Sequence, residues 1–322
     1  MFKILFTGNT FTKSEVTQLE SEGYMITPAK NDLSTPELIE ALKSVDAYIV
    51  GGTEIVNEEV IKSAVPQLKL ITNFGIGTGT IDVQAANAAG VLVANTLKVS
   101  TYSVAEFTVA LLMTLNKRIF EFSHDTRSDI GKRLEMFDLK NKTVGIVGMG
   151  SIGTYTARIL NKAFNMRVLY HDIIQKFAIE EELNAQKVAL EQLLEESDIV
   201  SLHASLNAST TNMIGKNELA RMKHTALLIN TARAKLVDPD ALFDALSNEI
   251  LAGAAFDGFY TEPVDRTQPG GKLLELSEGK FILTPHTGFN VYENSDKIKR
   301  MTIDNLKTLL NGINSPNLVI NC

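Results

Sequence analysis

Three stretches in the second half of the sequence each place a chemically versatile side chain just after an apolar run. Arg233 follows the run ALLIN, Glu262 lies in the loop after AGAAF, and His286 follows FILT. Because parallel strands end at a common edge of their sheet, we expect these side chains to meet there. Each one alone is more often a surface or structural residue, but together they supply an anion anchor, a proton carrier and a carboxylate that orients the carrier.

This set matches the needs of hydride transfer between a small 2-hydroxy acid and its 2-keto acid. Arg233 can clamp the carboxylate of the acid and polarise the neighbouring carbonyl. His286 donates a proton when the keto acid is reduced and accepts one when the hydroxy acid is oxidised. A carboxylate partner such as Glu262 favours the imidazolium form and fixes the ring tautomer.

A glycine-rich turn upstream indicates where the hydride carrier binds. The run TVGIV leads into Gly148, Gly150 and Gly153, and a helical pattern follows directly. This spacing allows a tight turn, lets a pyrophosphate approach the backbone, and lets helix and strand pack closely. Nineteen positions after Gly153, Asp172 ends the next apolar run, where a carboxylate can bind the adenosine ribose. Because that carboxylate would repel the 2′-phosphate of NADP and no arginine follows it, the sequence predicts NAD as cofactor.

Short apolar runs alternate with amphipathic stretches of helical length, a pattern typical of βα units around parallel sheets. The runs of the first group predict a small α/β layer structure: Phe2–Thr7, Ala47–Val50, Leu68–Asn73 and Val91–Ala94. The runs of the second group predict a complete doubly wound sheet: Thr143–Val147, Arg167–His171, Asp198–Leu202, Ala226–Asn230, Ala252–Ala255 and Phe281–Leu283.

The segments between and after these groups are expected to be helical or irregular. From Tyr102 to about Phe122 the pattern predicts one long helix, apolar around nearly its whole circumference and therefore buried on several sides or at an interface. The region His124–Asn141 is polar and predicted to be irregular. Helical spacing returns over roughly Tyr292–Gly312, which could cross back onto the first domain.

The bulk composition narrows the class of protein. At 322 residues the chain is long enough for about two domains. It lacks a run of roughly 18 apolar residues and a leader-like N-terminus, so we expect no membrane span and a cytoplasmic location. The single cysteine, Cys322, ends the chain, which argues against a disulfide framework. The net charge of −7 without a basic stripe argues against nucleic-acid binding.

The remaining histidines are weaker candidates. No pair among the five histidines has metal-ligand spacing, so no metal site is expected. His203 follows the run DIVSL at the same expected sheet edge, where it either lines the cofactor site or is structural. We interpret His124, His171 and His224 as ordinary residues.

Taken together, these stretches resemble the D-isomer-specific 2-hydroxyacid dehydrogenases, and the resemblance covers nearly the whole chain. The matching segments are NFGIGTGTID (73–82), SVAEFTVALL (103–112), TVGIVGMGSIGT (143–154), LLINTARAKLVD (227–238), AGAAFDGFYTEP (252–263) and LTPHTGFN (283–290). The resemblance implies that Arg233, Glu262 and His286 form the catalytic trio.

The resemblance also implies contacts to the ligands. It places a nicotinamide carboxamide contact on Asp257, and it places the substrate carboxylate on the backbone N–H groups of Gly75, Ile76 and Gly77, with Arg233. The expected contacts to the dinucleotide are Gly148, Met149, Gly150, Ser151, Ile152, Asp172, Thr231, Ala232 and Asp257.

The fold implied is α/β with two Rossmann-like domains. A doubly wound, parallel-sheet NAD-binding domain, residues 101–290, is inserted into a smaller flavodoxin-like substrate-binding and catalytic domain, residues 1–100 and 291–322. Members of the family are commonly homodimers through the cofactor domain, which would explain the apolar helix after Tyr102.

Within the family, the run IVGGTEIVNEEVI (49–61) resembles the phosphoglycerate dehydrogenase-like subgroup. Phosphate-binding members often carry an arginine here, but this chain has Gly51 and Gly52, so recognition of a phosphate is not favoured. Lys98 either offers a cation to the substrate or is an exposed lysine. The substrate therefore stays open among the phosphoglycerate, glycerate or glyoxylate, and lactate types.

Two hypotheses from other classes compete with an NAD-dependent oxidoreductase acting on a CH–OH group. One is a non-catalytic NAD(H)-sensing protein of the corepressor type, which keeps the same fold and even the catalytic residues. The compact length and the charge of −7 favour the enzyme. The other is a different Rossmann enzyme, such as an S-adenosylhomocysteine hydrolase, which the T-P-H and N-T-A-R segments do not support.

Overall fold

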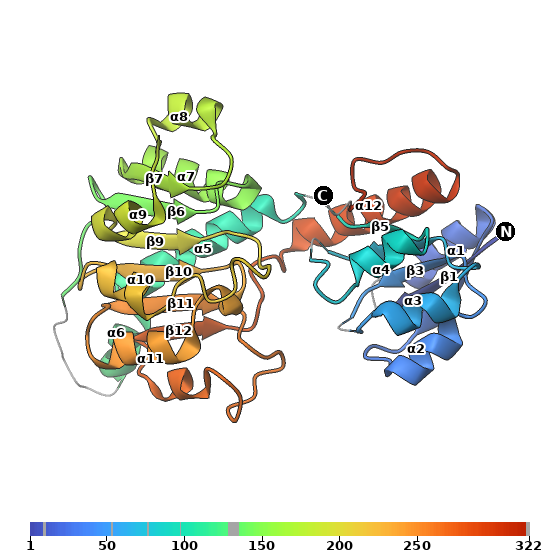
Figure 1. Ribbon diagram of the computed structural model, residues 1–322, viewed down its shortest axis with the longest axis horizontal. Helices are drawn as coiled ribbons and strands as arrows, with labels where there is room; N and C mark the ends of the chain where they lie inside the picture. The colour runs from blue at the N-terminus through green and yellow to red at the C-terminus, as the bar shows by residue number, and fades with distance from the viewer. Residues whose placement is uncertain (9–10, 53, 76, 97, 128–134, 320–322) are drawn as a thin grey trace. The chain divides into compact units, whose positions relative to one another are not determined.

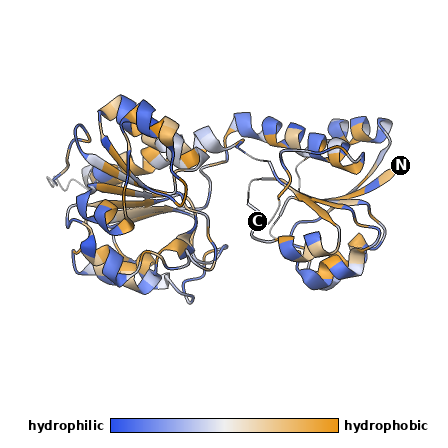
Figure 2. Ribbon diagram, turned by 45° about the horizontal axis from the view of Figure 1, so that its top comes forward, coloured by the Kyte–Doolittle hydropathy of each residue, from blue (hydrophilic) through white to orange (hydrophobic). Residues whose placement is uncertain are grey.

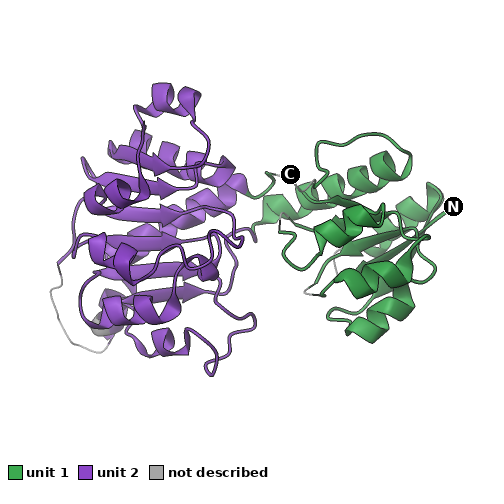
Figure 3. Cartoon of the chain, viewed as in Figure 1, with its two compact units in different colours: residues 1–100, 291–322 green, residues 101–290 purple. Residues whose placement is uncertain are grey.

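In the computed structural model, residues 1–100 and 291–322 form one unit and residues 101–290 form a second (Figure 3). The structure describes residues 1–8, 11–52, 54–75, 77–96, 98–127 and 135–319. Each unit contains a parallel sheet covered by helices on both faces, with its own core, and Figure 2 shows the strands of both sheets as mainly hydrophobic. The α/β fold class predicted from the alternation of patterns is confirmed.

The first unit contains a five-stranded parallel sheet in the order β2-β1-β3-β4-β5 (Figure 1). Its strands are β1 (Phe2–Thr7), β2 (Tyr24–Ala29), β3 (Ala47–Val50), β4 (Leu70–Asn73) and β5 (Leu92–Ala94). Its helices are α1 (Lys13–Ser21), α2 (Thr35–Leu42), α3 (Glu58–Ala64), α4 (Val83–Ala88) and α12 (Tyr292–Leu310). The order 2-1-3-4-5 is that of flavodoxin-like sheets.

Helix α12 belongs to this first sheet although it follows the second unit in sequence. Leu306 and Leu309 are buried beside Ile49 and Leu70 of β3 and β4. The Asn305 amide donates to Thr72 Oγ1 (3.3 Å) and to the Asn95 carbonyl (3.0 Å), so it satisfies polar groups inside that contact. The predicted return of the tail onto the first group of strands is confirmed.

The second unit contains a seven-stranded parallel sheet in the order β12-β11-β10-β9-β6-β7-β8. Its strands are β6 (Thr143–Val147), β7 (Arg167–His171), β8 (Gln186–Lys187), β9 (Ile199–Leu202), β10 (Leu227–Asn230), β11 (Gly253–Asp257) and β12 (Phe281–Thr284). The α-helices are α5 (Thr101–Asn116), α6 (Ile119–Arg127), α7 (Ser151–Phe164), α8 (Phe177–Leu183), α9 (Leu190–Glu196), α10 (Lys216–Arg221) and α11 (Pro239–Ser247), and two short 3₁₀ turns are η1 (Ala234–Leu236) and η2 (Gly271–Glu275). Because β6 is followed by β7 on one side and neighboured by β9 on the other, the strand order reverses between β6 and β9, where ligands of such sheets bind.

Two hydrophobic clusters fill the two faces of the second sheet. Residues of β9 and β10 are completely buried, as expected for parallel strands with helices on both sides. Packing is tight at Gly145 of β6, where an added Cβ would lie 2.4 Å from Leu193 of α9. The near-continuous apolar character of these strands explains why their positions could be predicted from sequence.

The predicted long helix from Tyr102 to Phe122 is wrong in one respect, because the chain forms two helices. The break lies at Lys117 and Arg118, between α5 and α6, and Arg118 has a left-handed φ of 47°. The Asn116 amide donates to the Phe137 carbonyl (3.0 Å), which ties the end of α5 to the segment before β6. Helix α6 continues to Arg127, so His124–Arg127 are helical rather than irregular.

The other differences from expectation concern edge strands. Strands β2 and β8 were not predicted, and both lie at an edge of their sheet, where exposed alternate residues weaken the apolar pattern. No helix in the described part of the chain is long and apolar enough to span a membrane.

Candidate active site

Three neighbouring strands of the second sheet end in loops that carry the predicted trio. Arg233 follows β10, Glu262 follows β11 and His286 follows β12, and these strands pair side by side in parallel register. The three residues therefore lie at the same carboxyl edge of one sheet, as the sequence predicts.

Within the trio, His286 and Glu262 are in direct contact. The imidazole Nδ1 lies 3.0 Å from Glu262 Oε2 and 3.2 Å from Oε1. The Phe259 backbone N–H donates to Oε1 (3.1 Å), which holds the carboxylate in place. Because the carboxylate contacts Nδ1, the opposite ring nitrogen, Nε2, is the one directed to exchange a proton with a substrate.

The electrostatics of the pair keep Glu262 ionised. The hydrogen bond from His286 lowers the pKa of Glu262 below its ordinary value, and partial burial opposes this shift. The charge of His286, the Phe259 N–H and the charge of Arg233 lower it further. At neutral pH the site therefore contains an ionised carboxylate in contact with the imidazole, and a guanidinium whose charge stabilises that carboxylate.

The loops around the pair depend on unusual backbone angles. Gly258 has a φ of +100°, and a Cβ there would lie 2.6 Å from Glu262 Oε1 and 3.3 Å from His286 Cγ. His286 itself has a left-handed φ of 53°, which is uncommon for a residue with a Cβ and is concentrated at functional sites. Gly258 is thus a site residue that the sequence reasoning missed, although its place between Asp257 and the trio glutamate could have indicated it.

Asp257 fastens the loop that carries His286. Its buried carboxylate accepts from the Thr284 hydroxyl (2.7 Å) and from the backbone N–H groups of Thr287 and Gly288 (2.8 Å each). Both oxygens are engaged, so Asp257 links the end of β11 to both sides of the histidine. The sequence could not show this role of Thr284 and Thr287, because nothing in it reveals where the carboxylate points.

Arg233 lies in a turn that Asn230 shapes. The Asn230 amide donates to the Arg233 carbonyl (2.8 Å), and its Oδ1 accepts from the Ala232 N–H (3.0 Å). The exposed guanidinium of Arg233 donates through Nη1 to the Ala232 carbonyl (2.7 Å). Thr231 is buried, with its hydroxyl 2.7 Å from that of Thr108 on α5. The guanidinium makes no other hydrogen bond with a described residue, so most of its donors are available to a ligand.

The glycine turn after β6 has the shape of a phosphate cradle. Gly148 has a φ of +93°, and a Cβ there would lie 2.6 Å from the Ala204 backbone. A Cβ at Gly153 would lie 2.1 Å from the Gly148 carbonyl, so helix and turn pack without a side chain between them. At Gly150 an added Cβ would meet nothing within 4 Å, and Gly150 caps α7 without a side-chain hydrogen bond. Open space in front of uncapped N–H groups suits a pyrophosphate.

Asp172 lies beside this turn, at the end of β7. Its Oδ2 accepts from the Met149 N–H (2.7 Å) and its Oδ1 from the Ile174 N–H (2.8 Å). Carboxylate oxygens each have a second lone pair, so ribose hydroxyls can still donate to them. Ser151 and Ile152 form the first turn of α7. The residues of this cradle fit NAD.

The predicted substrate loop belongs to the other unit. Gly75 and Gly77 follow β4, where the Gly75 carbonyl accepts from the Thr96 N–H (3.0 Å) and the Gly77 carbonyl from the Asn73 amide (2.6 Å). Ile76 lies outside the described residues. Lys98 is exposed and has a φ of 62°. The carboxylate contact of this loop stays a prediction.

The environment of His203 favours the neutral form of its imidazole. Burial lowers the pKa of His203 to about 3, and its Nε2 lies 2.9 Å from the Ser201 hydroxyl. A neutral imidazole in this position is structural or lines the cofactor. Among the described residues, no group of three His, Cys, Asp or Glu side chains is arranged to hold a metal ion.

Comparison with known proteins identifies similar chains along the whole sequence. The model of the D-isomer specific 2-hydroxyacid dehydrogenase family, NAD binding domain, matches residues 109–288. Glyoxylate reductase of Korarchaeum cryptofilum is 39% identical over 288 residues, which cover 88% of this chain and 85% of that protein. Glyoxylate reductase of Thermococcus litoralis is 37% identical over 291 residues, which cover 88% and 86%. Among solved structures, D-lactate dehydrogenase of Aquifex aeolicus complexed with NAD and lactic acid superposes with a TM-score of 0.87 at 28% identity, over 99% of each chain.

Proposed function

The chain belongs to the D-isomer specific 2-hydroxyacid dehydrogenases and is an NAD-binding oxidoreductase that acts on a CH–OH group, and from this premise we propose that it reduces glyoxylate and related short 2-keto acids with NADH. The observation that carries the proposal is the pairing of His286 with Glu262 beside Arg233, at the edge where the strand order of a nucleotide-binding sheet puts its ligands. The names of the similar glyoxylate reductases support the choice of substrate.

In the proposed reaction His286 controls the proton. Glu262 accepts a hydrogen bond from the Nδ1–H of the imidazolium, which fixes the ring, and the proton on Nε2 is the one transferred to the oxygen on C2 of the keto acid. In the reverse direction the neutral ring accepts the hydroxyl proton at Nε2. Because the lowered pKa keeps Glu262 ionised, the imidazolium formed in that step is stabilised.

Arg233 orients the acid and polarises its carbonyl. A guanidinium presents a planar set of donors that matches a carboxylate bidentately, and the exposed face of Arg233 offers such donors. We propose that the backbone N–H groups of Gly75, Ile76 and Gly77 share the carboxylate. Binding in a defined pose keeps C2 in reach of both the hydride and His286.

NAD would be held by the cradle already described. Bound there, NADH supplies a hydride to C2 of the keto acid. Gly150 and the N-terminus of α7 would hold the pyrophosphate and Asp172 would bind the ribose, while Thr231, Ala232 and Asp257 lie at the neighbouring strand ends. The engagement of Asp257 by its own loop leaves lone pairs for a carboxamide N–H group, so the two roles are compatible.

The proposed substrate carries no phosphate. A Cβ at Gly52 would lie 2.7 Å from Oε1 of Glu54, a buried carboxylate, so the position where phosphate-binding members place a cation is close to an acid instead. This observation favours glyoxylate, hydroxypyruvate or pyruvate over 3-phosphohydroxypyruvate, in spite of the resemblance to the phosphoglycerate dehydrogenase-like subgroup.

We further propose that the protein is a homodimer and is located in the cytoplasm. Nine residues of α5 are buried, and Leu111, Leu112 and Leu115 among them belong to a hydrophobic cluster of the second unit, so the apolar character of this helix does not by itself require a partner. Exposed aromatic and aliphatic side chains remain on its first turn and on α6, at Tyr102, Ile119 and Phe120. We propose that these take part in the subunit contact.

A panel of keto acids tests the function. NADH oxidation is measured with glyoxylate, hydroxypyruvate, pyruvate and 3-phosphohydroxypyruvate, and glyoxylate or hydroxypyruvate is expected to give the highest kcat/KM. His286→Ala should lower kcat roughly a thousandfold with NADH affinity unchanged, whereas His124→Ala on α6 should leave both unchanged. Turnover of none of the four acids despite NADH binding, or an unimpaired His286→Ala enzyme, would contradict the proposal.

A further inference from the structure

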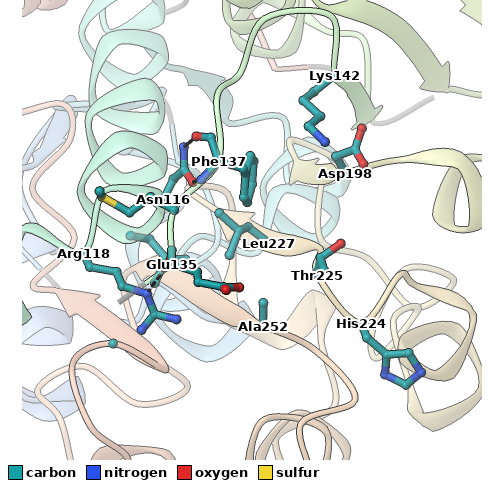
Figure 4. A pocket seen from close by; sticks show the side chains of 13 residues that line it. Asn116, Arg118, Glu135, Phe137, Lys142, Asp198, His224, Thr225, Leu227 and Ala252 are labelled. Atoms are coloured by element: carbon teal, nitrogen blue, oxygen red, sulfur yellow. Dashed lines mark hydrogen bonds between the residues drawn. The ribbon is translucent and has the colours of Figure 1, made fainter. Parts of the chain in front are cut away.

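The amino edge of the seven-stranded sheet contains a cavity of about 310 Å³ that the proposed reaction does not use (Figure 4). Five of its lining residues lie one or two positions before a strand: Lys142, Asp198, Thr225, Ala252 and Gly279. In Figure 4 the charged ends of Lys142 and Glu135 lie on opposite sides of Leu227, so they do not converge on one ligand group. Contacts that do converge on a reactive side chain lie at the opposite, carboxyl edge of the sheet.

Thr284 is the last residue of β12, and its backbone carbonyl accepts two hydrogen bonds. The Gly258 N–H donates to it (3.0 Å) from the end of β11, and the His286 N–H donates to it (2.9 Å) across Pro285. The second bond closes a three-residue turn, and the proline ring at its centre restricts φ. His286 follows this turn with its left-handed φ of 53°. The Thr284 carbonyl therefore fixes the backbone directly before the imidazole.

The hydroxyl of Thr284 acts on the other side of His286. It donates to Asp257 Oδ1 at 2.7 Å, which is a short, charge-assisted hydrogen bond. The same oxygen accepts from the Thr287 N–H, and Oδ2 accepts from the Gly288 N–H (2.8 Å each). Thr284 thus holds the chain before His286 directly and the chain after it through the carboxylate of Asp257.

Asp257 is only 4% exposed, so its carboxylate depends on the donors around it. Without the Thr284 hydroxyl, Oδ1 keeps one donor among the described residues, the Thr287 N–H. Valine at position 284 places a methyl group where the hydroxyl oxygen lies 2.7 Å from Oδ1, and carbon cannot approach oxygen so closely. The carboxylate then turns away, and the N–H groups bound to it move with it. A left-handed φ persists only where its surroundings determine it, so His286 is expected to shift.

We propose that Thr284 is a positioning residue for His286. This inference rests on the proposed function, in which Nε2 of His286 exchanges a proton with the oxygen on C2 of the substrate. Glu262 is held separately by the Phe259 N–H (3.1 Å), so a shift of the His286 loop changes both the contact between imidazole and carboxylate and the direction of Nε2. A misplacement of about 1 Å at a reacting group costs up to roughly 100-fold in rate.

Steady-state kinetics of Thr284→Val with the preferred keto acid test the proposal. The kcat should fall about ten- to hundredfold, whereas the KM for the keto acid and the Kd for NADH should change less than about threefold, because Arg233, Gly150 and Asp172 keep their surroundings. Thr284→Ser keeps the hydroxyl and should retain kcat within about threefold of the wild type. Thr156→Val is the matched control, because the hydroxyl of this buried threonine on α7 has no hydrogen-bond partner. Its kcat should equal that of the wild type.

Two further measurements separate positioning from folding and from the proposed function. The solvent isotope effect on kcat, measured in H₂O and D₂O, should rise in Thr284→Val, because proton transfer from a misdirected imidazole becomes slower relative to the other steps. A smaller folded fraction would leave this effect unchanged. The NMR signal of the His286 Cε1–H group, assigned by its absence in His286→Ala, should shift in Thr284→Val but not in Thr284→Ser or Thr156→Val.

An unchanged kcat in Thr284→Val, an equal loss in Thr284→Ser, or a raised KM with kcat kept would overturn the proposal. A shifted His286 signal in a protein that turns over none of the keto acids would support the positioning and contradict the proposed function instead. Thr284→Ala, which removes the hydroxyl without a γ-methyl group, carries the same expectations if Thr284→Val does not fold.

Discussion

The first βα connection of each sheet occupies the same topological position, yet the N-termini of the two helices that follow are capped in different ways. Strand β1 leads to α1 and strand β6 leads to α7, each beside the point where the strand order reverses. A helix N-terminus at such a point presents unpaired N–H groups, which must bond to a side chain, to water or to a ligand. The two turns resolve this requirement differently.

The N-terminus of α1 is closed by its own side chains. Thr12 Oγ1 accepts from the Glu15 N–H (3.3 Å), and Glu15 Oε2 accepts from the Thr12 N–H (2.6 Å) and from its hydroxyl (2.7 Å). This reciprocal capping box satisfies the donors locally. The N-cap residue of α7 is Gly150, which has no side chain to cap the helix. The order of the strands alone therefore does not decide whether a helix N-terminus is left open; the residues at the start of the helix do.

Gly150→Asp would convert the open turn into a closed one. Gly150 has a φ of −77° and open space around its missing Cβ, so aspartate fits and can cap α7. Its carboxylate would also face the pyrophosphate, and like charges brought together cost several kcal/mol, so the Kd for NADH should rise about 100-fold. Fluorescence titration measures the Kd, and Gly150→Ala, which adds no charge, should change it far less. An unchanged Kd in Gly150→Asp would show that the turn does not hold the phosphates.

Asp172→Ala probes the second partner of the open turn. Loss of the ribose hydrogen bonds should raise the Kd for NADH about tenfold, while the Kd for NADPH should fall or stay constant because the repulsion of the 2′-phosphate is removed. The ratio of the two dissociation constants is the measurement, since removal of the Met149 N–H acceptor affects both cofactors alike. A parallel loss for both cofactors would mean that Asp172 only supports the turn.

The open turn was predictable from sequence because its signals are local. A buried strand, glycines at fixed spacing and an acid at the next strand end lie within thirty positions, and β6 and β7 have the predicted bounds. The grouping of Arg233, Glu262 and His286 was predictable because parallel strands share an edge. These inferences needed only the period of apolar residues and the direction of the strands.

What the sequence could not show depends on side-chain direction and on the ends of elements. The carboxylate of Asp257 turns toward Thr284 and Gly288, which no spacing reveals. The break at Arg118 interrupts an apolar pattern that otherwise continues, because contacts to the segment before β6 outweigh helix propensity there. The cavity at the amino edge joins residues from loops that are far apart in the chain.

Thr12→Ala opens the closed turn and should affect stability only. Loss of the cap is expected to lower the free energy of unfolding of the first unit by about 1 kcal/mol, with the Kd for NADH unchanged. Amide exchange of α1 and of the strands beside it reports the stability, because the two units need not unfold together. A raised Kd for NADH would contradict the distinction between the two helix N-termini, because it would show that the capped start of α1 also contributes to cofactor binding.

Glu15→Gln should have the smallest effect, and that effect should depend on pH. Burial raises the pKa of Glu15, but hydrogen bonds from the Thr12 N–H and hydroxyl and the ion pair with Lys299 (3.3 Å) outweigh it, so the pKa lies below the ordinary 4.5. A carboxyl group with a lowered pKa in the folded state stabilises the fold above its unfolded pKa, and this contribution disappears as the pH falls through the folded value. The free-energy difference between wild type and Glu15→Gln should therefore be constant at pH 6–7, at some tenths of a kcal/mol, and should shrink below about pH 4.5. Glu20→Gln, exposed on the same helix, is the control, and a difference for Glu15→Gln that persists at pH 3 would show that the charge of Glu15 does not close the turn.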